Sequence, residues 1–180
     1  MTHLKNQNNE NNGVEREEKA VLNNKGINPV VYFAVCLIAM ICLNFTLTNQ
    51  ILHNIFLSTN NYKLIDIVYV QNTGAAFSSF QHSTIILICI GVIAIVAILT
   101  ELFRDIRKYS LPMHFASAML VAGILSNTWE RFSLGYVRDF INIKFIEFPV
   151  FNISDILINL GVLVIIILIV TKKYRRNANI

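Results

Sequence analysis

Four long apolar segments restrict the folds open to this chain. They cover about residues 30–47, 84–102, 111–125 and 153–170. A helix needs about 20 residues to cross a bilayer, and these segments lack the polar face that a helix of a soluble bundle would carry. The third segment is short, so its helix must extend over Ser126 and Asn127. The chain is 54% hydrophobic and only 14% charged, which is typical of a polytopic membrane protein. We therefore expect an all-α membrane protein with four transmembrane helices.

Basic residues next to the apolar segments predict the orientation in the membrane. They lie between the second and third segments and after the fourth: Arg104, Arg107, Lys108, Lys172, Lys173, Arg175 and Arg176. Basic loops stay in the cytoplasm, so both termini are expected there, and the connections at 48–83 and 126–152 should face outward. The net charge of +4 then reflects topology. Because no aromatic-interleaved basic stripe is present, we do not expect nucleic-acid binding.

The polar ends of the chain lie outside the membrane domain. Residues 1–29 are Asn-rich and mixed in charge, which predicts a disordered cytoplasmic tail, and they lack the features of a cleaved signal peptide. Residues 30–171 form the expected membrane domain, and 172–180 a basic cytoplasmic tail. Cys36, Cys42 and Cys89 lie within apolar segments without metal-ligand spacing. We expect no disulfide, metal or cofactor.

The two outer connections carry strand-like patterns. KLIDIVYVQNTG has a β-branched and aromatic run before a turn signal, and in DFINIKFIEF the residues Ile141, Ile143 and Phe145 alternate with Asn142 and Lys144. We expect the two segments to pair as a small β-sheet on the outer face, with any chemistry where this sheet meets the helix ends.

Two carboxylates belong to this outer region. Asp155 stands near the outer end of the last apolar segment, and Asp139 precedes it by sixteen residues. A solvated helix-start aspartate that caps free N–H groups is the plainer interpretation of Asp155. If the chain folds back so that the two meet, they share one proton, and the pair can activate water and polarise a carbonyl. Spacing alone leaves both interpretations open.

Three motifs resemble the signal peptidase II family of bacterial lipoprotein signal peptidases. QNTGAAFSSF (71–80) is similar to N-T-G-A-A-F-S of that family, and AGILSNTWERFSLGYVRDFI (122–141) to G-G-A-x-G-N-x-x-D-R followed by G-x-V-x-D-F. FNISD (151–155) is similar to F-N-x-A-D. Their order and spacing relative to four spans agree with the family over about residues 30–172.

The resemblance implies a catalytic pair and a set of supporting residues. Asp139 and Asp155 fall on the catalytic positions. The positions that support the site or bind substrate are occupied by Asn72, Gly123, Asn127, Arg131 and Asn152, and Asn49 matches a further family position at the end of the first span. The chain departs from the family pattern at that point, where NQILH replaces D-Q-x-x-K. It also departs at Ala122, Ile124, Ser126, Glu130 and Ser154, where the family usually has Gly, Ala, Gly, Asp and Ala.

The implied function is that of a membrane aspartic endopeptidase. The resemblance implies that it removes signal peptides from diacylglyceryl-modified prolipoproteins before the lipidated cysteine, in the bacterial inner membrane, with the site at the outer face. We expect a monomer in contact with membrane lipid. Asn49 and Glu130 motivate the alternative of an inactive relative that still binds signal sequences. A small channel or transporter subunit would have polar residues spread through its spans, whereas only a few, such as Asn44 and Asn159, lie there.

Overall fold

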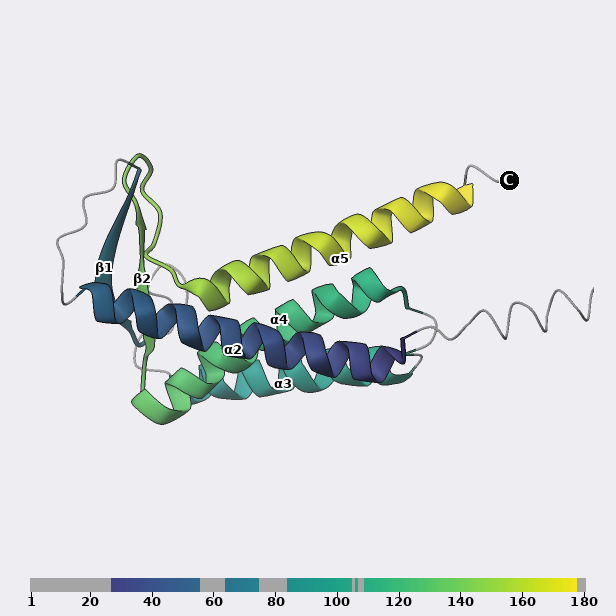
Figure 1. Cartoon of the computed structure of the whole chain (residues 1–180), viewed down its shortest axis with the longest axis horizontal. Coiled ribbons are helices and arrows are strands. Elements are labelled where there is room, and N and C mark those ends of the chain that lie inside the picture. Colours follow the sequence, from purple (N-terminus) through teal and green to yellow (C-terminus); the bar gives the residue numbers. More distant parts are fainter. Residues whose placement is uncertain (1–26, 56–63, 75–83, 105, 107–108, 178–180) are drawn as a thin grey trace, which may run out of the picture.

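Four helices and a two-stranded sheet make up the part of the chain that the structure describes. The computed structural model describes residues 27–55, 64–74, 84–104, 106 and 109–177. The elements are α2 (Pro29–Ile55), β1 (Ile65–Asn72), α3 (Thr84–Arg104), α4 (Leu111–Leu134), β2 (Val137–Ile143) and α5 (Ile153–Asn177). Figure 1 shows the helices running lengthwise with the sheet at one end. The start of α2 and the end of α5 lie at the opposite end.

The helices form a membrane bundle around α4. Among the described residues, α2, α3 and α5 are long and apolar enough to cross a bilayer. α4 packs against all three of them, and Ala116, Ala118 and Ala122 on this helix are fully buried. Small side chains let helix backbones approach closely where hydrophobic burial gives no advantage over lipid. α4, the third span in chain order, can carry polar side chains such as His114 and Ser117 because its surface faces protein.

Three helices end later than the apolar segments alone predict. α2 continues to Ile55, so Asn49 and His53 lie on its last two turns, and α4 continues to Leu134. α5 continues to Asn177, into the segment expected to be a basic tail from residue 172. Hydropathy detects only the part of a helix that contacts lipid or core. Some predictions lie outside the described residues. They concern the N-terminal tail up to residue 26, residues 75–80 of the motif at 71–80, Arg107 and Lys108, and residues 178–180.

The predicted pairing of the two outer connections is confirmed. β1 and β2 are antiparallel, from Ile65 opposite Ile143 to Asn72 opposite Val137. Between Ile67 and Val70 the register shifts, so that two residues of β1 oppose Phe140 alone. Such a bulge re-aims neighbouring side chains and is common next to active sites. Here it lies directly beside Asp139, which opposes Val70.

The chain reverses sharply between α4 and β2. Gly135 follows the last helical residue with φ of 86°, and its N–H donates to the carbonyl of Arg131. This left-handed conformation closes a helix at little cost only for residues such as glycine. Only Tyr136 then separates the turn from the first residue of β2, so the end of α4 and the start of the strand stay close together.

Candidate active site

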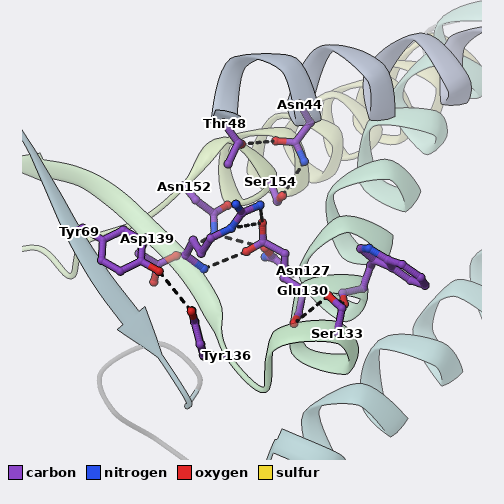
Figure 2. A network of polar contacts seen from close by, with 12 residues as sticks. Asn44, Thr48, Tyr69, Asn127, Glu130, Ser133, Tyr136, Asp139, Asn152 and Ser154 are labelled. Carbon is purple, nitrogen blue, oxygen red and sulfur yellow. Dashed lines mark hydrogen bonds and ion pairs between the residues drawn. The ribbon is translucent and has the colours of Figure 1, made fainter. Parts of the chain in front are cut away.

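A bridge between β2 and Phe151, two residues before α5, brings the two carboxylates to one cavity. The N–H groups of Phe140 and Ile141 both donate to the carbonyl of Phe151, and the Phe151 N–H donates to Ile141. Phe151 therefore lies against β2, the strand that contains Asp139, and this places the next residue, Asn152, beside Asp139. Figure 2 shows the side chains of Asp139, Asn152 and Asn127 converging from β2, from the start of α5 and from α4. The chain thus folds back between positions 139 and 155, a geometry that the spacing alone had left open.

Asn152 is the centre of the polar network. Its side-chain amide donates to Asp139 Oδ1 at 2.7 Å and to Asn127 Oδ1 at 3.2 Å. Its Oδ1 accepts from the backbone N–H of Asp155 at 3.0 Å. Only 4% of Asn152 is exposed, so these bonds are protected from water, and each is stronger than it would be at the surface. One amide thus links both acidic residues.

Asp155 both caps α5 and belongs to the network. Asn152 is the residue before the first helical position, and its backbone N–H donates to Asp155 Oδ2 at 3.1 Å. Together with the reverse bond to Asn152 Oδ1, this is a reciprocal capping box. The other oxygen, Oδ1, accepts from the amide of Asn127 at 2.8 Å. The capping role expected from the sequence and the contact with the polar network therefore coexist in one side chain.

Asp139 is buried and held by two amides. It is 2% exposed, and its Oδ2 accepts from the amide of Asn72 at 2.8 Å. Burial raises the pKa of Asp139 to about 6, and the charge of Asp155 contributes in the same direction. The bonds from Asn72 and Asn152 and the charge of Arg131 oppose this shift in pKa but do not cancel it. Near neutral pH this carboxyl therefore holds a proton far more readily than an ordinary aspartate.

Arg131 joins the first outer connection to α4. One of its terminal nitrogens donates to the carbonyl of Gly74 at 2.9 Å and the other to the carbonyl of Asn127 at 3.4 Å. The Gly74 N–H in turn donates to Asn72 Oδ1 at 2.9 Å. Asn72 is thereby fixed at both ends of its amide, and its NH₂ group is aimed at Asp139. The buried Nε of Arg131 has no hydrogen-bond partner among the described residues.

Both carboxylates line one cavity of about 910 Å³. Asn72, Asn127 and Arg131 line it as well, and Ile156, Asn159 and Leu160 extend its wall along α5 away from the sheet. Apolar side chains of the sheet and of residues 148–151 complete the lining, so the polar groups around the two carboxylates lie within a largely apolar wall. Within the part of the chain that the structure describes, no group of three His, Cys, Asp or Glu side chains could hold a metal ion.

Three described residues of the predicted site do not line this cavity: Asn152, Gly123 and Asn49. Asn152 still contacts both acidic residues from behind the lining. Gly123 contacts α5 instead: a Cβ atom there would lie 2.5 Å from the Ser154 carbonyl oxygen and 2.7 Å from the Ile158 side chain. It permits close helix packing one turn from Asn127. Asn49 is exposed on α2 and is absent from the described lining of the cavity, so the structure does not bring it to the site.

Sequence reasoning missed two polar pairs around the site. Glu130 forms an ion pair with Arg138, the residue before Asp139, at 2.6 Å. Buried Asn44 of α2 donates to the hydroxyl of Ser154, the residue before Asp155, at 2.9 Å. Each pair contains a residue at which the chain departs from the family pattern, Glu130 in one and Ser154 in the other. These departures were the sequence signal that could have pointed to the pairs.

Comparisons with known proteins agree with the geometry. A model of the family described as "Signal peptidase (SPase) II" matches residues 33–171. The chain belongs to the signal peptidase II family. A lipoprotein signal peptidase of Streptococcus thermophilus (strain CNRZ 1066) is 30% identical over 142 residues, covering 77% of this chain and 92% of the relative. One from Lactococcus lactis subsp. cremoris (strain SK11) is 33% identical over 111 residues, covering 61% of this chain and 72% of that relative.

Solved structures show the same fold for this signal peptidase II chain. A bacterial membrane enzyme determined by the in meso method at 2.3 Å resolution superposes with a TM-score of 0.67 and 25% identity, over 78% of this chain and 88% of the other. A second, determined at 1.9 Å, gives 0.61 and 26% over 76% and 91%. The predicted family and the predicted helical membrane fold with a two-stranded sheet are therefore confirmed.

Proposed function

We propose that this chain is a membrane aspartic endopeptidase that removes signal peptides from diacylglyceryl-modified prolipoproteins by cleaving before the lipidated cysteine. The observation that carries the proposal is the connection of Asp139 to Asp155 through the single amide of Asn152, on a cavity that both carboxylates line. The names of its relatives support the substrate class.

The two carboxylates divide the proton transfers between them. Asp139, with its pKa of about 6, holds the shared proton and donates it to the oxygen of the scissile carbonyl. Asp155 takes a proton from the water whose oxygen bonds to the carbonyl carbon. Collapse of the tetrahedral intermediate breaks the C–N bond, the leaving nitrogen receives the proton from Asp155, and the carbonyl re-forms as its proton returns to Asp139. No covalent intermediate forms between enzyme and substrate.

The shape of the cavity fits a substrate held in the bilayer. Around the carboxylates it presents the amides of Asn72 and Asn127 and the guanidinium of Arg131, which can bind an extended peptide backbone. Its wall along α5 includes Ile156 and Leu160 within a membrane span. In this proposal the signal helix enters from the side and its lipid chains remain in the membrane. The start of α2 and the end of α5 lie at the end of the bundle away from the sheet (Figure 1). In this proposal that end faces the cytoplasm, the site faces outward across the inner membrane, and the protein acts as a monomer.

Replacing either carboxyl tests the proposal. Asp139→Asn and Asp155→Asn keep the side-chain shape and remove its acid–base function. We expect the purified full-length variants to leave a diacylglyceryl-modified precursor peptide uncleaved by mass spectrometry. Asp66→Asn, on the same sheet but at its far end, is the matched control and should cleave normally. Full cleavage by either site variant would refute the assignment, and substrate binding without turnover by the wild-type protein would identify an inactive relative.

A further inference from the structure

Glu130 and Arg138 form the shortest ion pair of the described residues around the site. Arg138 donates to Glu130 Oε1 through its terminal nitrogen at 2.6 Å and through Nε at 3.0 Å. The backbone N–H of Arg138 donates to the other carboxylate oxygen at 2.8 Å. One carboxylate therefore holds both the side chain and the main chain of a single residue. Side-chain exposure is only 16% for Glu130 and 21% for Arg138.

This pair spans the turn that leads into the candidate catalytic strand. Glu130 lies on the last turns of α4, Gly135 reverses the chain, and Arg138 is the second residue of β2. The next residue is Asp139. A bond from Glu130 to the Arg138 main chain therefore fixes the distance between α4 and the backbone of Asp139. α4 also carries Asn127, which bonds to Asp155, so the same helix anchors both halves of the carboxylate network.

We propose that Glu130 and Arg138 act together as a positioning pair that holds Asp139 in register with Asn152 and Asp155 for catalysis. This inference rests on the proposed aspartic peptidase function. It gives Glu130, where the family pattern usually has Asp, a defined partner in this chain. Neither residue lies on the described lining of the cavity, so the pair acts through Asp139 and not on substrate.

A second ion pair on the same sheet distinguishes positioning from general sheet stability. Lys144 contacts Asp66 at 2.7 Å, with side-chain exposures of 32% and 31%. It joins the far end of the sheet, five residues beyond Asp139. Both pairs link elements that hold the sheet in place, but only the pair of Glu130 and Arg138 is adjacent to a carboxylate of the site. Loss of either should lower stability, whereas only loss of the first should slow the chemical step.

The test is a double-mutant cycle in the purified full-length protein with a diacylglyceryl-modified precursor peptide. Glu130→Ala, Arg138→Ala and the double variant are compared with Asp66→Asn for kcat, KM and thermal unfolding. We expect each single variant to lower kcat at least tenfold with KM within about twofold, since a misplacement of about 1 Å can slow a reaction about 100-fold. The double variant should be no slower than the slower single variant, because the two residues act as one unit.

The outcomes separate this inference from the proposed function. Asp139→Asn is measured alongside, and full activity of that variant refutes the proposed function itself. If Asp139→Asn is inactive while Glu130→Ala retains at least half of the wild-type kcat, the positioning pair is refuted alone. Multiplicative losses of kcat in the double variant would also refute it, as would a loss of kcat in Asp66→Asn equal to that in Glu130→Ala.

Discussion

Gly123→Ala tests the close packing that brings α4 and α5 together at the site. The added Cβ would lie 2.5 Å from the Ser154 carbonyl oxygen and 3.1 Å from the Ile158 backbone nitrogen. Both are backbone atoms of α5 and cannot rotate away, so the helices must separate by about 0.5–1 Å to restore van der Waals contact. Overpacking of this kind costs about 1–3 kcal/mol of unfolding free energy.

The same displacement should reach the polar network of the candidate active site. Asn127 follows Gly123 by one helical turn, and its amide donates to Asp155, the residue after Ser154, at 2.8 Å. A separation of about 0.5–1 Å would lengthen this bond beyond the ordinary hydrogen-bond range. We expect kcat to fall about 10- to 100-fold, measured by steady-state cleavage of a lipidated precursor peptide, together with a lower midpoint of thermal unfolding.

Gly161→Ala is the matched control for this effect. A Cβ there would lie 2.9 Å from the Ala116 carbonyl oxygen and 2.9 Å from the Leu120 nitrogen, in the same interface but about 9 Å along α5 from Asp155. It should lower stability to a similar extent with less than a threefold change in kcat. Equal losses of kcat in both variants, or an unchanged kcat in Gly123→Ala, would refute the argument from local displacement.

Three further predictions follow from the polar network. The folded protein binds the Asp139 proton more tightly than the unfolded chain does, so this group's contribution to stability is full below pH 4 and is lost as pH rises through about 6. The loss in unfolding free energy approaches about 3 kcal/mol. Asp139→Asn should remove this part of the pH dependence of thermal unfolding. Ser154→Ala deprives the buried Asn44 amide of its acceptor and should cost about 1–3 kcal/mol, most of which Asn44→Leu in the same chain should restore in unfolding experiments. Asn72→Ala removes a donor to Asp139 and should lower kcat about 10- to 100-fold with little change in KM, and unchanged kinetics would contradict the role of this amide.

The membrane helices could be predicted because their signal is local. Three of the four apolar segments lie on helices that are long and apolar enough to span a bilayer, and only the third needs neighbouring polar residues to reach that length. The extension of α4 beyond Asn127 to Leu134 could not be predicted in this way. Its last turns carry Asn127, Glu130 and Arg131, whose partners Asp155, Arg138 and Gly74 come from other elements. Those polar residues are stable in a helix end only because the fold supplies the partners.

The spacing of the two aspartates in the sequence could not predict that both would line one cavity, because this depends on contacts between distant segments. Family resemblance singled out Asp139 and Asp155, but their sequence separation allowed many geometries. The β-bulge opposite Phe140 and the bonds from Phe140 and Ile141 to Phe151 determine the one that forms. Asn49 shows the opposite case: it matches a family position, yet it lies exposed on α2 away from the cavity.

The double use of Asp155 limits how freely this position can change. One carboxylate oxygen of Asp155 accepts from the Asn152 N–H at the start of α5, and the other accepts from the Asn127 amide. Any replacement therefore alters both the helix start and the candidate active site. The side chain of Asp139 has no comparable role in forming its strand, because β2 pairs with β1 through backbone bonds. Replacing Asp139 therefore leaves the backbone bonds of β2 in place and removes only its proposed part in the reaction, whereas replacing Asp155 also removes a cap of α5.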